Sequence, residues 1–551
     1  MDMTGIKLYD TTLRDGAQRE RISFSVSDKL KIAYELDKLG IHYIEGGWPG
    51  SNPKDAEFFE RVQKLDLKHS RIVAFGSTRR KGVKPEDDSN LKALIDSGVP
   101  AVCIVGKCWN LHVERALRTT LEENLNMIGD SVAYLKSKGL EVLFDAEHFF
   151  DGYLEKPDFA LAALKAAESA GADYLVLCDT NGGTMPDDVK RIVEEVKKET
   201  TVPLGIHAHN DAECAVANSI IAIQAGVSQV QGTINGYGER CGNANLCSII
   251  PALQLKLGIK VISDDQLKLL TEASHFVSEI ANLSPYPQQP YVGHSSFAHK
   301  AGLHTSAVER EERGYAHIDP GLVGNIQRVV VSELAGKSTI ILKAQELGID
   351  LTDEPHRVTD LLNRIKGLEH LGYQFEAADA SLEILIRKSL GIKPHFFKLE
   401  RFRVTMEKRE DGKVATEATI KLQVGGRTVI ETAEGNGPIN ALDLALRKAI
   451  GTVYPALSDI ELNDFKVRVL DEKTGTEAIT RVLIESGDGQ KTWGSIGVSE
   501  NIIEASWQAL IDSIEFGLMH KKMHERNDLL LNGFYEIDEG HGIKIFRPSD
   551  R

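Results

Sequence analysis

Two histidines placed two positions apart are the first residues of this chain that suggest chemistry. Residues 206–211 read I-H-A-H-N-D and follow an apolar lead that is typical of a buried strand. Side chains alternate between the two faces of a strand, so His207 and His209 share one face and can reach one point in space. Two imidazoles at the end of a strand suit a metal ion, whereas a packed strand with a hydrogen-bonded histidine is the simpler alternative.

A second stretch, near the start of the chain, offers the acidic partner that such a metal site needs. Residues 8–18, L-Y-D-T-T-L-R-D-G-A-Q, run from an apolar strand into a turn that carries Asp10, Arg14 and Asp15. A carboxylate and two imidazoles would form a three-ligand site with open positions, the arrangement of a catalytic metal centre. Because this set of donors suits Mg, Mn and Zn alike, the identity of the ion stays open.

The elements that must position these residues repeat one pattern over residues 7–258. A short apolar strand is followed by a polar turn and an amphipathic helix, and strands of this kind are typical of parallel sheets buried on both faces. The repeat predicts an α/β fold, a (β/α)8 TIM barrel; a doubly wound open sheet is the alternative, but no G-x-G-x-x-G follows the first strand. The predicted strands are residues 7–9, 43–45, 72–76, 101–105, 141–144, 174–178, 204–207 and 229–234.

In a barrel of this kind, catalytic residues stand at the carboxyl ends of the strands. The polar residues that follow the predicted strands would therefore meet at one mouth, and they are denser there than a purely structural barrel requires. They include Asp10, Arg14, Asp15, Glu45, Ser77, Thr78, Lys107, Asp145, Glu147, Asp179, Thr180, His207 and His209.

Composition limits the classes of partner. The net charge of −16 argues against nucleic acid and against an anionic membrane surface. No apolar run reaches the roughly 18 residues of a membrane span, and no signal-peptide pattern is present. Six cysteines without a C-x-x-C fit reduced thiols. We therefore expect a cytoplasmic protein whose partners are small molecules.

A chain of 551 residues is too long for one core, and its pattern changes along the sequence. We expect the barrel at residues 1–270 and mostly helical linker subdomains at 271–395. Residues 396–520 contain three strands and a helix, twice, which predicts a duplicated βββα domain. Residues 521–551 form a charged C-terminal tail.

Motifs in both halves of the chain form a combination that covers nearly its whole length. They are residues 13–18 (L-R-D-G-A-Q), 45–49 (E-G-G-W-P), 179–182 (D-T-N-G), 207–211 (H-A-H-N-D), 238–244 (G-E-R-C-G-N-A), 297–304 (F-A-H-K-A-G-L-H), 315–325 (Y-A-H-I-D-P-G-L-V-G-N) and 435–442 (G-N-G-P-I-N-A-L). In this combination the chain resembles the metal-dependent acyl-CoA condensing enzymes related to 2-isopropylmalate synthase and homocitrate synthase. Residues 47–55, G-W-P-G-S-N-P-K-D, are most similar to the bacterial citramalate synthase subgroup.

The resemblance implies a divalent metal held by Asp15, His207 and His209, with Asn243 contributing directly or through water. It implies that a 2-oxo acid chelates this metal and that acetyl-CoA condenses with it in a Claisen-type acyltransfer. In the subgroup the oxo acid is pyruvate and the product is citramalate, for isoleucine biosynthesis. Alternatives are 2-isopropylmalate or homocitrate synthesis with another oxo acid, a related metal-dependent lyase, and a non-catalytic sensor built on a metal-stabilised barrel.

Arg14 adjoins the implied ligand Asp15 and can stabilise the oxyanion that forms on the oxo acid. A structural ion pair with Glu45 or Asp179 is the alternative role for this arginine. Thr180 is implied to hydrogen-bond the substrate carboxylate, although a plain strand-end cap would also explain it.

The condensation needs a base for the methyl group of acetyl-CoA, and the candidates are Glu147 and His304. We expect His304 to be the base or general acid, with Tyr315 beside it and Glu147 orienting the substrate. Asp145 stands where some relatives carry an aromatic or small residue, and we expect it to contribute to the substrate pocket.

The duplicated domain resembles the effector-binding dimerisation domain of the same family. The resemblance implies a homodimer and a branched-chain amino acid as effector, with isoleucine expected if the product feeds that pathway. A dimerisation module without an effector is the alternative.

Overall fold

The computed structural model describes residues 5–299, 316–329, 336–351, 354–391, 396–408, 410, 412, 414–470 and 478–531. These residues form two compact units, which are considered separately: one contains residues 5–297 with 317–327, and the other contains the remainder. His304 and Tyr315, the two catalytic residues predicted beyond the barrel, lie outside the described residues, as does most of the predicted tail.

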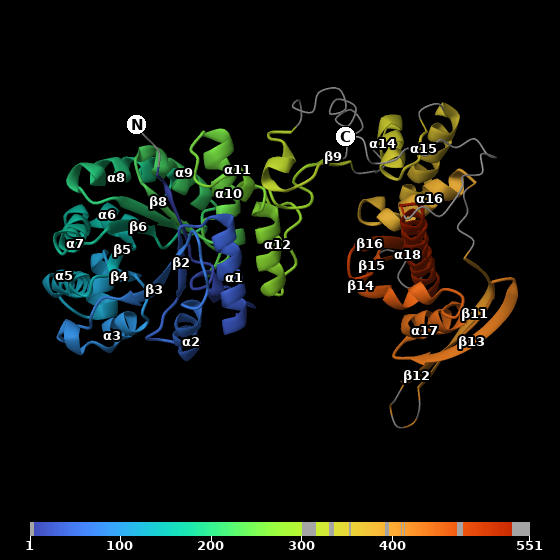
Figure 1. Cartoon of the computed structure of the whole chain (residues 1–551), viewed down its shortest axis with the longest axis horizontal. Helices are drawn as coiled ribbons and strands as arrows, with labels where there is room; N and C mark the ends of the chain where they lie inside the picture. The colour runs from blue at the N-terminus through green and yellow to red at the C-terminus, as the bar shows by residue number, and fades with distance from the viewer. Residues whose placement is uncertain are drawn as a thin grey trace. The chain divides into compact units, whose positions relative to one another are not determined.

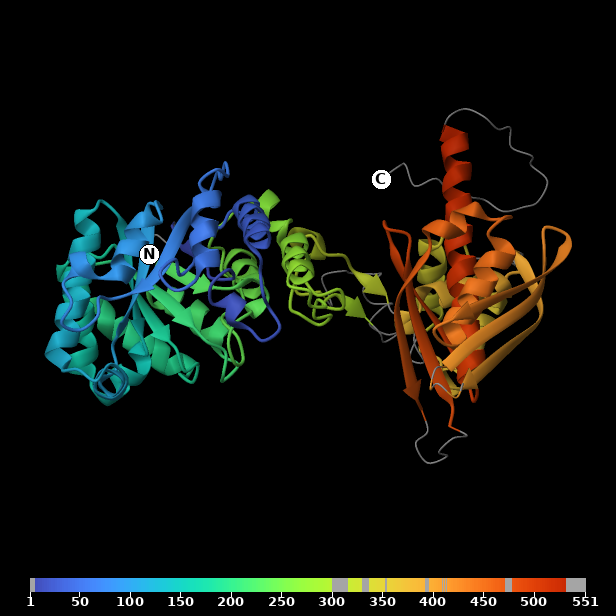
Figure 2. The same cartoon turned by 90° about the horizontal axis from the view of Figure 1, so that it is seen from below.

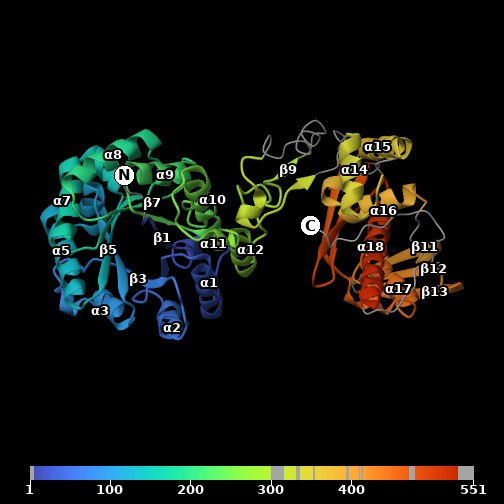
Figure 3. The same ribbon diagram turned by 45° about the horizontal axis from the view of Figure 1, so that its top comes forward.

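The first unit is a closed barrel of parallel strands that run in sequence order from β1 to β8. The strand β1 pairs with both β2 and β8, which closes the sheet and confirms the predicted (β/α)8 barrel over the open alternative. Figures 1 and 3 show the strands inside a ring of helices. The strands are β1 (Lys7–Asp10), β2 (Tyr43–Gly47), β3 (Arg71–Ser77), β4 (Ala101–Lys107), β5 (Glu141–Glu147), β6 (Tyr174–Asp179), β7 (Leu204–Ala208) and β8 (Gln229–Gly232).

Helices connect these strands and cover the outside of the barrel. The first begins after Ser25, whose side chain forms a capping box with Asp28, and ends at Gly40, which adopts a left-handed conformation (φ 87°). The helices of this unit are α1 (Val26–Leu39), α2 (Pro53–Val62), α3 (Ser89–Asp96), α4 (Asn110–His112), α5 (Leu121–Ser137), α6 (Phe149–Glu155), α7 (Pro157–Ser169), α8 (Pro186–Glu199), α9 (Ala215–Ala225), α10 (Leu246–Pro251), α11 (Asp264–Leu267) and α12 (Leu270–Ile280).

Two apolar layers hold the barrel. Outside the sheet, Phe144 of β5 and Ile128 of α5 are fully buried, and both lie so close to Gly106 that a side chain there would collide with the phenylalanine ring. Inside the sheet, a smaller cluster includes the stacked rings of Tyr9 and Tyr43, whose centroids lie 5.9 Å apart. The inner cluster fills part of the barrel interior with apolar side chains.

The second unit contains two short strands, a set of helices and a duplicated domain at its end. The helices are α14 (Lys337–Glu346), α15 (Pro355–His370) and α16 (Asp379–Ser389); two short strands, β9 (Ala298–His299) and β10 (Arg328–Val329), pair in parallel. One half of the duplication is β11 (Phe397–Lys408), β12 (Val414–Val424), β13 (Arg427–Gly435) and α17 (Pro438–Ile450); the other is β14 (Glu461–Val469), β15 (Thr480–Gly487), β16 (Thr492–Ser499) and α18 (Ile502–Leu531).

Each half of the duplication has an antiparallel sheet of three strands and one helix, as the sequence predicts. Figure 2 shows α18 between the two sheets. Residues of both halves, such as Leu422 of β12 and Ile484 of β15, belong to one hydrophobic core. The two halves are therefore one folding domain and not two separate ones.

Within the described part of the chain, no helix is both long enough and apolar enough to cross a membrane.

Candidate metal centre

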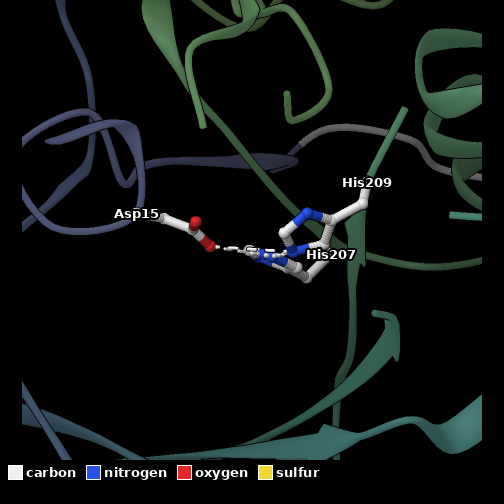
Figure 4. Close-up of side chains that lie close together, drawn as sticks. All are labelled: Asp15, His207 and His209. Carbon is white, nitrogen blue, oxygen red and sulfur yellow. Dashed lines mark hydrogen bonds and ion pairs between the residues drawn. The ribbon is translucent and has the colours of Figure 1, made fainter. Parts of the chain in front are cut away.

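Three predicted ligands meet at the mouth of the barrel. Nε2 of His207 lies 3.4 Å from Oδ2 of Asp15 and 3.2 Å from Nε2 of His209, while the Asp15–His209 distance is 3.8 Å. Figure 4 shows the three side chains pointing toward one another. All three are buried, with no more than 5% of any residue exposed. The period-two argument for the histidine pair and the choice of Asp15 as their neighbour are both consistent with this geometry.

Hydrogen bonds in the loops fix the position of the turn that carries Asp15. Asp15 follows β1 in a turn where the backbone N–H groups of Arg14 and Gly16 donate to the carbonyl of Thr11. The hydroxyl of Thr12 donates to Asp10 (2.8 Å) and accepts from the backbone N–H of Ile234 (2.9 Å), which ties this turn to the loop after β8.

The charges around the cluster prepare two of its members as ligands. Burial opposes ionisation of Asp15, yet the charge of Arg14 and the hydrogen bond with His207 hold the pKa of that carboxyl well below its usual range. Burial, followed by the neighbouring His207, lowers the pKa of His209 to about 3. Asp15 is thus an anion and His209 a neutral imidazole, which are the forms that bind metals.

The pKa of His207 shifts in the opposite direction to that of His209, because two effects oppose each other there. Burial disfavours the charged imidazole, but the hydrogen bond and the charge of Asp15 outweigh it and raise the pKa of His207. Nε2 is the ring nitrogen that faces Asp15, and it is the atom that a metal ion would bind. On the other side of the ring, Nδ1 lies 2.9 Å from Oε1 of Gln231.

Asn243, the fourth predicted ligand, is held beside the histidines. It forms an isolated β-bridge with His209, and its Nδ2 donates to the carbonyl of Tyr237 at 3.1 Å. Its Oδ1 is buried and has no hydrogen-bond partner in the described part of the chain. A buried amide oxygen of this kind calls for a ligand atom or water, so a role for Asn243 at the metal stays a prediction with this support.

The donors fit a divalent metal ion. The Asp15 oxygen and the two imidazole nitrogens all lie within 4.8 Å of one another. One carboxylate and two imidazoles leave further coordination positions for substrate or water, as in catalytic centres, and suit several ions.

Arg14 forms an ion pair with Glu45, one of the two partners considered for its alternative role, and also lies beside Asp15, the predicted metal ligand. Its Nε lies 2.5 Å from Oε1 of Glu45, and its Nη1 lies 3.3 Å from Oδ2 of Asp15. The guanidinium carbon lies 3.8 Å from the centre of the Phe75 ring, and Tyr9 donates to the other oxygen of Glu45. These contacts orient the guanidinium toward the cluster, so the ion pair and a role at the metal are compatible.

The remaining predicted residues lie around the same mouth. Glu147 forms an ion pair with Lys107, and both side chains are about one quarter exposed (23% and 24%). The hydroxyl of Thr180 accepts from the backbone N–H of His148 at 2.9 Å, which is the strand-end role that the sequence left open. Asp145 is 3% exposed and accepts from Gln231 at 3.2 Å. Substrate contacts of Glu147, Thr180 and Asp145 stay predictions.

Sequence analysis missed Gln231, which contacts both His207 and Asp145. A signal was present: Gln229 and Gln231 place two amides on one face of a strand that is buried throughout in a parallel sheet. Buried polar side chains in such strands need partners, and their presence indicates a functional network.

Three successive segments of the chain match models of known protein families. Residues 5–277 match the HMGL-like family model, residues 291–372 the homocitrate synthase post-HMGL domain-like model, and residues 376–518 the LeuA allosteric (dimerisation) domain.

Curated relatives are similar over almost their full length. A protein of Geobacter sulfurreducens named (R)-citramalate synthase is 57% identical over 94% of this chain and 98% of its own. Another of that name, from Aquifex aeolicus, is 54% identical over 93% of this chain and 98% of its own. A 2-isopropylmalate synthase of Methanocaldococcus jannaschii is 30% identical over 92% of this chain and 94% of its own.

The cluster predicts that His207→Ala abolishes tight metal binding. Removing one of three ligands should weaken Mn²⁺ affinity by more than about 100-fold, since changes to outer-shell partners alone cost 10- to 100-fold. Isothermal titration calorimetry of the metal-free protein measures this affinity. His69→Ala, at an exposed histidine, is the matched control and should bind Mn²⁺ as the unaltered protein does. Unchanged Mn²⁺ affinity in His207→Ala would exclude this residue as a ligand.

Proposed function

The chain belongs to the HMGL-like family, in the group that contains the curated (R)-citramalate synthases, and from this membership we propose that it condenses acetyl-CoA with pyruvate to give citramalate and CoA. The observation that carries the proposal is the buried cluster of Asp15, His207 and His209 with Arg14 beside it. Similarity to relatives of one name over 93–94% of the chain supports the choice of pyruvate.

The site offers the groups that the reaction needs. A divalent ion held by Asp15, His207 and His209 would polarise the keto carbonyl of the oxo acid. Arg14 would stabilise the negative charge that develops on the keto oxygen, because its guanidinium is fixed by Glu45 before the substrate arrives. Fixed donors cost no reorganisation during the reaction, which is why such groups favour the transition state.

The methyl group of acetyl-CoA must lose a proton before it attacks the carbonyl. Glu147 is a candidate for orienting this substrate, since its carboxylate is partly exposed at the mouth and is held by Lys107. We keep His304, with Tyr315, as the proposed base or general acid. A base close to the thioester would supply the proton transfer that this weakly acidic carbon requires.

The second unit supports a regulated dimer. Residues 376–518 match a model described as an allosteric dimerisation domain, and the two βββα halves form one core. We propose a homodimer in which isoleucine binds this domain and inhibits the barrel, since the product would feed isoleucine synthesis. Acetyl-CoA, pyruvate and a Mg, Mn or Zn ion complete the proposed set of partners, and we propose that the enzyme acts in the cytoplasm.

The proposed substrate predicts a clear order in a panel of 2-oxo acids. Release of the CoA thiol should be fastest with pyruvate and at least about tenfold slower with 2-oxoisovalerate or 2-oxoglutarate, because a pocket that excludes extra carbons discriminates by 1–3 kcal/mol each. A thiol-release assay with acetyl-CoA measures these rates, and EDTA should abolish all of them. Equal rates across the panel would contradict a pyruvate-specific enzyme, and full activity in EDTA would contradict the metal.

The proposed role of Arg14 predicts that substituting this residue lowers kcat. Arg14→Gln should lower kcat by about 10²–10³, the cost of removing one preorganised donor at a developing oxyanion. Arg14→Lys keeps the buried charge beside Glu45 but loses the planar fork, so it should fold well and recover only part of kcat. The measurement is steady-state kinetics with metal content checked. Arg61→Gln, on the surface of α2, is the control. Normal kcat in Arg14→Lys and Arg14→Gln would reduce Arg14 to a structural partner of Glu45.

The proposed effector predicts inhibition by isoleucine. Saturating isoleucine should lower the rate at limiting substrate by about 5- to 150-fold, the usual range of allosteric coupling. The thiol-release assay with isoleucine, and with alanine as the matched control, measures it. An unchanged rate would leave the domain as a dimerisation module.

A further inference from the structure

A chain of hydrogen bonds runs from the metal cluster into the barrel interior. His207 of β7 and Gln231 of β8 are register partners, and Nδ1 of the histidine lies 2.9 Å from the Oε1 of the glutamine. Gln231 in turn donates from Nε2 to Oδ1 of Asp145 at 3.2 Å. Asp145 belongs to β5, which is not a neighbour of β8, so this contact crosses the barrel. All three residues are at most 5% exposed.

The direction of the first bond decides whether His207 can bind a metal. A neutral imidazole carries one proton, and when Nδ1 donates it to a carbonyl oxygen the lone pair of Nε2 is free for a metal ion. If Gln231 presented its NH₂ group to Nδ1 instead, the proton would sit on Nε2 and the ring could not bind a metal at that atom. The orientation of one amide therefore sets the ligand form of His207.

The carboxylate of Asp145 favours one of the two orientations of the Gln231 amide. The NH₂ group of Gln231 lies 3.2 Å from Oδ1 of Asp145 and 3.5 Å from Oε1 of Gln229, which is on the same face of β8. A flipped amide would direct its own oxygen at the Asp145 carboxylate and lose that hydrogen bond at a fully buried position, which is costly, whereas the Gln229 amide could turn to donate in its place. The oxygen of Gln231 is therefore left to face His207.

We propose that Gln231 and Asp145 are positioning residues for the metal. Asp145 holds the Gln231 amide in one orientation. The amide oxygen then accepts a hydrogen bond from Nδ1 of His207, which leaves the lone pair of Nε2 free to bind the ion. This inference rests on the metal site of the proposed function. In this role Asp145 acts through Gln231 and does not contact the substrate, which distinguishes it from the substrate contact expected from the sequence. Outer-shell partners of a metal-bound histidine commonly change metal affinity 10- to 100-fold.

Mn²⁺ titration of the metal-free, full-length protein tests the proposal. Gln231→Met removes the acceptor at similar volume and should weaken Mn²⁺ binding by about 10- to 100-fold. Asp145→Asn keeps the shape of the side chain but offers an NH₂ group that permits the flipped amide, so it should weaken binding by a smaller factor. The double variant should bind as Gln231→Met alone does, because Asp145 acts only through Gln231.

The control is Asn218→Ala, which removes another fully buried amide of the same barrel, one that donates to Thr184, and should leave Mn²⁺ affinity unchanged. Thermal melting of the metal-free variants confirms that each is folded. If Gln231→Met does not fold, the Mn²⁺ affinity of Asp145→Asn and its KM for the oxo acid test the proposal instead.

Three results would overturn the proposal. The first is wild-type Mn²⁺ affinity in both single variants. The second is an Asp145→Asn variant whose only change is a raised KM for the oxo acid, which would return Asp145 to substrate binding. The third is an additive loss of affinity in the double variant. Failure of the unaltered protein to bind Mn²⁺ would instead remove the metal centre of the proposed function, and the inference with it.

Discussion

The site depends on how buried charges at the barrel mouth neutralise one another. Glu45 is fully buried, and a carboxylate in that position is costly unless it is paired. Arg14 pairs with it and also lies beside Asp15, so one guanidinium is shared between two carboxylates. The remaining negative charge faces the imidazoles of His207 and His209. A divalent cation at this point would offset that charge, which explains why such a costly arrangement is retained at the end of the barrel.

Closure of the barrel brings these charges together. Neighbouring strands lie about 4.8 Å apart, and β8 separates β1 from β7, so a side chain at the tip of β1 does not reach β7 directly. The turn after β1 spans this distance, and its hydrogen bond from Ile234 to Thr12 anchors it to the loop that follows β8. Asp15, in the turn after β1, and the two histidines at the end of β7 are therefore almost two hundred residues apart in sequence. The rigid barrel fixes the distance between them.

The second unit has a different physical character. Its two βββα halves each bury one face of a sheet against helices, and Leu422 and Ile484 belong to a core that neither half could form alone. Both groups of potential metal ligands found in the described residues lie in the barrel. The candidate metal centre is therefore a feature of the barrel, whereas the two halves of the duplicated domain are joined by apolar packing.

The sequence by itself determined the barrel, the duplication and the common face of the two histidines, because each depends on local periodicity, whereas the choice of Asp15 as their acidic partner came from the family resemblance. The two-residue spacing of His207 and His209 fixes their common face on any strand, and eight short apolar strands with helices between them predict the closed sheet. Only the tertiary structure decided the partners behind the ligands. The contact of Gln231 with Asp145 crosses the barrel between strands that are not neighbours, and the pairing of Glu45 with Arg14 depends on how the turn after β1 folds. Closure of the sheet sets such distances, and no local pattern in the chain encodes them.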